Sequence, residues 1–261
     1  MLRIRVVGDW GGALPSDVEA VARSAASSFP PLEDGESIGI LLEPVINPDD
    51  PPITINQLNV SGEVVVRLAV RGNHWAQMAF QFAHEFCHVL ADIRTWPGYE
   101  DRFAWIEEAI CATASHFALR SMAKTWAVSP PYPIWQEYAV NLDSYAVDRM
   151  AEPKHSLPPG LSFSDWMADH LSALESNPQT EVAGREVIAK ELLPVFEADK
   201  NAWRAVRHLH VWQRASTATL DDFVQGWADA SPPECRPAVD SIGLVISRRR
   251  GSPGRSSRRS G

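Results

Sequence analysis

Two histidines and a glutamate share one short stretch of the chain at a spacing that suits metal chemistry. The sequence reads His84-Glu85-Phe86-Cys87-His88, an HExxH motif inside a segment whose apolar residues recur at helical spacing. Four residues apart on a helix, the two imidazoles lie on one face and can both reach one tetrahedral zinc ion. Glu85 lies about 100° round the helix from His84, beside the metal position, where a general base for a metal-bound water must stand.

A third ligand is expected downstream, because a catalytic zinc usually takes three protein ligands and leaves its fourth position to water. Two neighbouring acids, Glu107 and Glu108, follow in a second predicted helix, with nineteen residues between His88 and Glu108. These acids point about 100° apart, so only one can face a metal held by the first helix. Side-chain volume does not choose between them, since small residues flank both faces.

With these residues the chain resembles the gluzincins, zinc metallopeptidases that include the thermolysin-like peptidases and the aminopeptidase N group. In that family a second helix carries the glutamate ligand, often in a Trp-x-x-Glu pattern, and Trp105 precedes Glu108 at that spacing. The chain departs from the family at two places. Glu107 stands where the family commonly has Asn, and Ala112 stands where thermolysin-like enzymes have an Asp that orients the first histidine.

The resemblance implies a ligand set, a base and a fold. His84, His88 and Glu108 would bind Zn²⁺, and Glu85 would act as catalytic base and proton shuttle in the hydrolysis of peptide bonds. Glu107 would hydrogen-bond a ligand histidine. The fold would be zincin-like: a small mixed sheet packed on the HExxH helix and the glutamate-bearing helix, followed by a mostly helical C-terminal half.

A peptidase of this kind also needs a hydrogen-bond donor for the oxyanion, usually a tyrosine or histidine from the helical half. We select Tyr145 as this catalytic donor. The other candidates are Tyr138, His155 and His170.

Three further residues are expected to be structural. Cys87 points about 100° away from His88, which favours a small core residue over a ligand. His208 and His210 are flanked by apolar residues and are interpreted as surface or core histidines, not as a second metal site.

The elements that must position these residues can be read from hydrophobic periodicity, and together they predict an α+β fold. Strands are expected at 4–7, 37–42 and 63–70, with a helix from residue 15, a turn-rich loop at 44–52 and the motif helices at about 75–89 and 104–124. The strand at 63–70 could be the edge strand that binds extended substrate, or an ordinary sheet strand. Further helices are expected near 134–150, 164–175, 182–198, 200–214 and 219–230, the third of them kinked or cut short at Pro194.

The same pattern suggests three parts. Residues 1–125 form a catalytic half with the HExxH and third-ligand helices, and residues 126–246 form a helical C-terminal half. The tail at 247–261 carries six arginines and no apolar residue, and is expected to be disordered.

Composition narrows the class of protein and its partners. The chain has 261 residues, 45% of them hydrophobic, and a formal net charge of -9. Because the tail contributes six arginines and no acid, the body carries -9 minus 6, or -15. An acidic body argues against nucleic acid, and no apolar run is long enough to cross a bilayer. Three cysteines do not describe a disulfide framework, and no secretory signal is visible, so a cytoplasmic protein is expected. The resemblance to metallopeptidases implies a peptide or protein substrate as its partner.

Two other functions fit the same residues. One is a regulatory metallopeptidase of the kind that cleaves phage-type repressors, which also carries HExxH followed by a Glu-Ala helix. The other is a catalytically inactive relative that keeps the zincin fold as a binding module, a reading favoured by Ala112.

Overall fold

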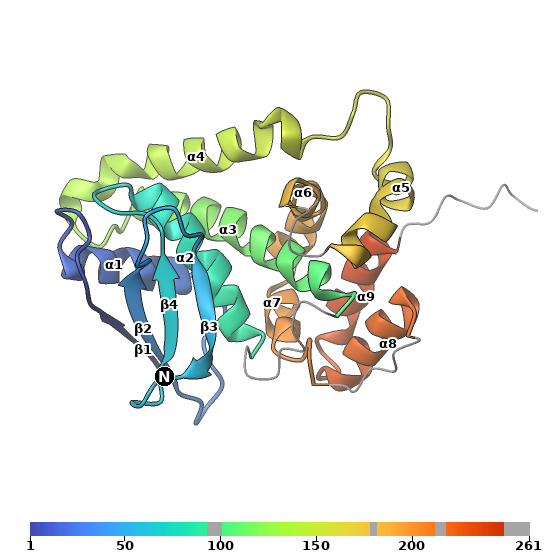
Figure 1. Cartoon of the computed structure of the whole chain (residues 1–261), viewed down its shortest axis with the longest axis horizontal. Coiled ribbons are helices and arrows are strands. Elements are labelled where there is room, and N and C mark those ends of the chain that lie inside the picture. Colours follow the sequence, from blue (N-terminus) through green and yellow to red (C-terminus); the bar gives the residue numbers. More distant parts are fainter. Residues whose placement is uncertain (93–100, 178–181, 212–217, 248–261) are drawn as a thin grey trace, which may run out of the picture.

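A computed structural model describes residues 1–92, 101–177, 182–211 and 218–247 (Figure 1). The described part is an α+β fold in which a four-stranded mixed sheet precedes a largely helical remainder, so the predicted fold class is confirmed at that level. The predicted tail lies outside the described residues except for Ser247.

The sheet has the order β1-β2-β4-β3, formed by β1 (Leu2–Val6), β2 (Ile38–Pro44), β4 (Val64–Leu68) and β3 (Ile53–Leu58). β1, β2 and β4 run parallel, and β3 pairs with β4 in the antiparallel direction.

Strand β3 decides between the two interpretations of the strand at 63–70. The predicted strand at 63–70 is β4, which lies between β2 and β3 and therefore presents no free edge to a substrate. The edge on that side is β3, which the sequence analysis did not predict. Its apolar alternation is short, it follows two prolines, and most of its residues are partly or fully exposed because an edge strand buries little.

Helices α1 (Pro15–Ala26) and α2 (Trp75–Leu90) pack on the sheet and on each other (Figure 1). The apolar side chains that the strands direct toward the helices, such as Ile40, Leu42 and Val66, are fully buried. On α2, Met78, Phe82 and Phe86 are buried as well, as the predicted apolar stripe requires. The opposite face of α2, which carries His84 and His88, is thereby held toward α3.

Helix α3 (Ala104–Trp126) crosses the molecule between α2, α4 and α6 and is buried along most of its length (Figure 1). The remaining elements are η2 (Pro133–Tyr138), α4 (Ala139–Ala151), η3 (Pro153–His155), α5 (Phe163–Ser176), α6 (Val182–Ala198), α7 (Lys200–Val206), α8 (Leu220–Ala230) and α9 (Arg236–Ile246).

Two of these elements differ from expectation. Helix α7 ends at Val206 instead of reaching 214, and α9 was not predicted. Helix α6 has the predicted range, and Pro194 lies inside it without cutting it short. A proline inside a helix removes one backbone hydrogen bond, and the burial of Leu192, Leu193 and Phe196 around it offsets that cost.

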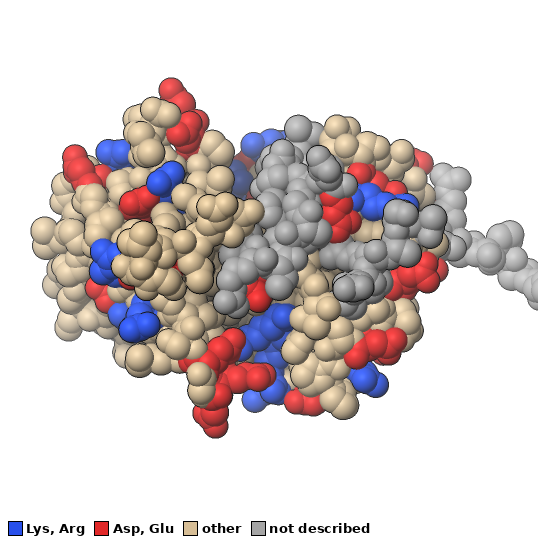
Figure 2. Space-filling model, turned by 60° about the horizontal axis from the view of Figure 1, so that its bottom comes forward, with Lys and Arg blue, Asp and Glu red and all other residues tan. Residues whose placement is uncertain are grey.

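One hydrophobic cluster joins buried side chains from the sheet, from α2 and α3 and from the C-terminal helices. The predicted boundary at 125/126 falls in the last turn of α3, and the division into two halves stays a prediction. Within the described ranges, none of the helices combines the length and the apolar character that crossing a bilayer requires. The face shown in Figure 2 carries acidic and basic side chains side by side.

Candidate metal centre

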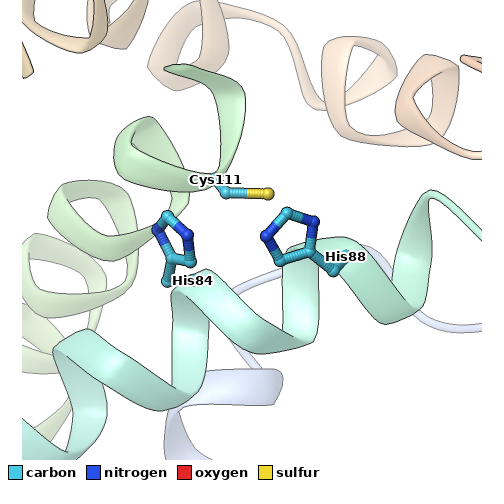
Figure 3. A group of neighbouring side chains, drawn as sticks. All are labelled: His84, His88 and Cys111. Atoms are coloured by element: carbon cyan, nitrogen blue, oxygen red, sulfur yellow. The ribbon is translucent and has the colours of Figure 1, made fainter. Parts of the chain in front are cut away.

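The two motif histidines lie one turn apart on α2 and face α3 (Figure 3). Their ring centroids are 5.2 Å apart. The side chain of His84 is 24% exposed and that of His88 is 9% exposed. Solvent therefore reaches the pair from the His84 side, whereas His88 is enclosed.

Glu108 lies next to both imidazoles, as the Trp105 spacing predicts. Its Oε2 is 3.4 Å from Nε2 of His84, and its Oε1 is 3.9 Å from Nε2 of His88. Burial alone would raise the pKa of Glu108, but the hydrogen bond with His84 and the nearby positive charges lower the pKa to about 2. Glu108 is therefore a carboxylate held beside two imidazole nitrogens.

Glu107 occupies a different position, behind His88. Its Oε1 lies 2.7 Å from Nδ1 of His88, so the predicted hydrogen bond to a motif histidine is present. Its Oε2 lies 2.7 Å from Nε2 of His210, and the residue is 2% exposed. Burial acts to lower the pKa of His88, but Glu107, Glu108 and Glu85 outweigh it and raise the pKa to about 10. Glu107 thus fixes the orientation of the His88 ring through the nitrogen that points away from Glu108.

The motif glutamate, Glu85, is held against the sheet. Thr54 on β3 donates its hydroxyl hydrogen bond to Oε2 of Glu85 at 2.8 Å, and the same hydroxyl lies 3.1 Å from the backbone oxygen of Glu85. Glu85 is 4% exposed. The edge strand therefore fixes one carboxylate oxygen of Glu85 and leaves the other for a second partner.

Cys111 points from α3 into the space between the two imidazoles (Figure 3). One nitrogen from each of His84 and His88 and the Cys111 sulfur all lie within 4.8 Å of one another. Burial raises the pKa of the Cys111 thiol well above its ordinary value. Cys87 is fully buried in the core, as predicted.

Arg185 on α6 approaches the same group from the other side. Its Nη1 forms an ion pair and hydrogen bond with Oε2 of Glu108, the oxygen that also faces His84. The side chain of Arg185 is only 12% exposed. A guanidinium therefore shares the carboxylate that the family resemblance assigns to a metal.

The four candidates for the oxyanion donor each make a different contact. The Tyr145 ring packs edge to face against Phe80, one turn before His84 on α2, with ring centroids 5.8 Å apart. The Tyr138 hydroxyl accepts a hydrogen bond from the backbone N–H of Ala76 at the start of α2. His155 bonds the backbone oxygen of Arg149, and His170 stacks on Trp166. The selection of Tyr145 stays a prediction.

Four residues of this centre were not predicted: Thr54, Cys111, Arg185 and His210. Cys111 carried a readable signal, because it follows Glu108 by three residues on one helix and so lies near it. The other three come from distant segments and carry no motif of their own. His210 was expected to be a surface or core histidine. Its hydrogen bond with Glu107 also makes it part of the polar network of this centre.

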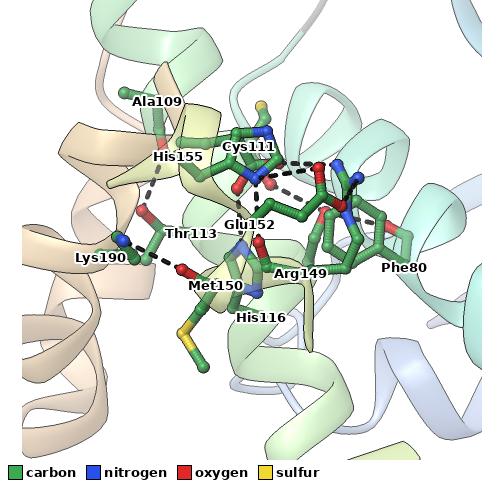
Figure 4. A network of polar contacts seen from close by, with 12 residues as sticks. Phe80, Ala109, Cys111, Thr113, His116, Arg149, Met150, Glu152, His155 and Lys190 are labelled. Carbon is green, nitrogen blue, oxygen red and sulfur yellow. Dashed lines mark hydrogen bonds and ion pairs between the residues drawn. The ribbon is translucent and has the colours of Figure 1, made fainter. Parts of the chain in front are cut away.

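A buried polar network fixes α3 against α4 and α6 two turns beyond Glu108 (Figure 4). Nε2 of His116 on α3 lies 2.7 Å from Oε2 of Glu186 on α6, and Nη2 of Arg149 on α4 lies 3.3 Å from Oε1 of Glu186. The Arg149 guanidinium also lies 5.2 Å from the centroid of the Phe80 ring. Since Glu186 follows Arg185 directly, this network anchors the turn of α6 that carries Arg185.

Glu186→Gln is expected to lower the free energy of unfolding by about 1.5–3 kcal/mol, because it weakens hydrogen bonds to a charged, buried group. Burial acts to raise the pKa of Glu186, but His116 and Arg149 outweigh it and lower the pKa below its ordinary 4.5. The Glu186 carboxylate therefore makes its full contribution to the free energy of unfolding above the ordinary pKa of a glutamate. That contribution is lost as pH falls through the lower pKa that Glu186 has in the folded protein. Urea unfolding at neutral and acidic pH measures both effects. The exposed Glu137→Gln is the control, and equal stability of both variants would contradict the expectation.

Comparison of the chain with models of known protein families, with curated proteins and with solved structures gives no match. The resemblance to gluzincins therefore rests on the sequence alone: the HExxH motif and the spacing of Trp105 and Glu108.

Proposed function

We propose that this chain is a zinc metallopeptidase of the gluzincin type that hydrolyses peptide bonds. The observation that carries the proposal is the approach of the Glu108 carboxylate to Nε2 of both motif histidines, at 3.4 and 3.9 Å. The predicted base, Glu85, follows His84 directly and is held in place by the edge strand.

The residues present fit zinc. Two imidazole nitrogens and a carboxylate are ligands that zinc takes in catalytic sites, with the fourth position left to water. The hydrogen bond from His88 Nδ1 to Glu107 is the support that metal-bound histidines usually have. His84, His88 and Glu108 would hold the ion.

When bound, zinc would polarise the scissile carbonyl and acidify the attacking water. Glu85 would take the proton from that water and deliver it to the leaving amine, as a general base and then a general acid. Thr54 would keep the carboxylate of Glu85 in one orientation while it does so. Tyr145 is our proposed donor to the oxyanion.

A second candidate function is a non-catalytic module with the same fold. The Arg185 guanidinium on Glu108 favours it, because this ion pair satisfies the carboxylate without a metal. In that case the carboxylates and histidines would form a structural polar cluster. Metal analysis separates the two candidates.

The purified chain is expected to carry about one zinc ion per molecule, and His84→Ala or His88→Ala is expected to remove it, because each histidine is one of three ligands. Plasma emission analysis of the dialysed protein measures zinc, and cleavage of a mixed peptide library measures hydrolysis. His74→Ala, an exposed histidine at the start of α2, is the matched control and should keep both. Zinc retained at parental level in both variants would defeat the assignment.

A further inference from the structure

The fourth donor at the centre is a thiol. Cys111 is fully buried on α3, and its sulfur lies within 4.8 Å of ligand nitrogens of both His84 and His88. A tetrahedral zinc with bonds of about 2.0–2.1 Å to nitrogen and about 2.3 Å to sulfur holds two nitrogens and one sulfur between about 3.3 and about 3.6 Å apart. Small side-chain rotations therefore bring these three atoms onto one ion.

Arg185 would compete with a metal ion for the carboxylate of Glu108. Arg185 pairs with Oε2 of Glu108, and this oxygen is the one nearest to His84. A carboxylate oxygen that accepts a charge-assisted hydrogen bond is a poorer metal ligand, because the guanidinium already neutralises it.

We propose that Cys111 is a ligand of the metal, so that His84, His88 and Cys111 hold the ion while Arg185 holds Glu108. This inference rests on the two histidines of the proposed metal site and changes its third ligand from Glu108 to Cys111. The thiol loses its proton to solvent as the metal binds, as every cysteine ligand does. No electron is transferred in this step.

The number of protein ligands decides whether the metal can bind a water molecule. Zinc bound by two histidines and one thiolate keeps an open position, whereas zinc that takes Cys111 and Glu108 together has four protein ligands and no position for water. Cys111 and Arg185 thus control whether the centre is open or closed. Cys111→Ser is expected to leave Glu108 as the third ligand.

Cobalt substitution of the full chain tests the proposal, because a cobalt–thiolate bond gives an intense near-ultraviolet charge-transfer band that nitrogen and oxygen ligands do not give. With one equivalent of Co²⁺ under anaerobic conditions, the parent should show this band. Cys111→Ser should bind cobalt and lose the band. Cys87→Ser is the matched control, since Cys87 is equally buried and directly precedes His88, and it should keep the band.

The outcomes separate this inference from the proposed function. Stoichiometric cobalt in the parent without a thiolate band would overturn the role of Cys111 and leave the peptidase proposal standing. A band that persists in Cys111→Ser and disappears in Cys87→Ser would also overturn it. Cobalt binding that survives His84→Ala and His88→Ala would defeat both. A thiolate band without any peptide hydrolysis would support the ligand and reject the peptidase.

Discussion

Glu85→Gln is expected to reduce peptide hydrolysis by about 10²–10⁴-fold while leaving the metal content and the fold unchanged. The amide has nearly the same shape as the carboxylate, and Thr54 can still donate its hydrogen bond to the amide oxygen. The amide cannot accept the proton of the attacking water, so only the chemical step is lost. Steady-state cleavage of a peptide found in the library screen, together with zinc analysis, measures both quantities.

Thr54→Val is the companion variant, because it removes the hydroxyl that orients Glu85 and keeps the base itself. A smaller loss than that of Glu85→Gln is expected, appearing in kcat more than in KM, since orientation affects the transition state. Glu85→Gln that cleaves as fast as the parent would show that Glu85 is not the base. The non-catalytic module would then be the better interpretation.

Local periodicity predicted the elements that carry the centre. The switch from alternating to helical spacing after residue 72 located α2, and the helical spacing of apolar residues in 104–124 located α3. The four-residue spacing of His84 and His88 placed both rings on one face because helix geometry alone decides it. Glu107 and Glu108 point in different directions because they are neighbours on a helix. Glu107 contacts Nδ1 of His88, and Glu108 faces Nε2 of the same ring.

Tertiary contacts account for what the sequence could not predict. Thr54 lies on an edge strand whose exposed residues weaken its apolar pattern, yet it pairs with a glutamate 31 residues later. Arg185 and Glu108 are 77 residues apart, and Glu107 and His210 are 103 residues apart. Such pairs depend on how α3, α6 and the chain after α7 pack, and no local spacing encodes that.

Glu107→Gln is expected to lower the free energy of unfolding by about 3–5 kcal/mol, the loss typical of one member of a buried ion pair. Glu107 is 2% exposed and accepts hydrogen bonds at 2.7 Å from His88 and from His210. The neutral amide cannot compensate an imidazolium, and its NH2 group, a donor, replaces one of the two oxygens that contact the separate rings. Metal affinity should also fall, by about 10–100-fold, because the His88 ring loses the partner that orients it.

Glu108→Gln is the neighbouring comparison, and it should cost less stability. Its partner Arg185 can still donate to the amide oxygen, and that side chain retains some contact with solvent. Urea unfolding of the metal-free variants and zinc titration of each measure the two effects. Parental stability in Glu107→Gln, or an equal loss in both variants, would mean that the carboxylate between His88 and His210 does not hold the two rings. The orientation of His88 would then have to come from its packing between α2 and α3 alone.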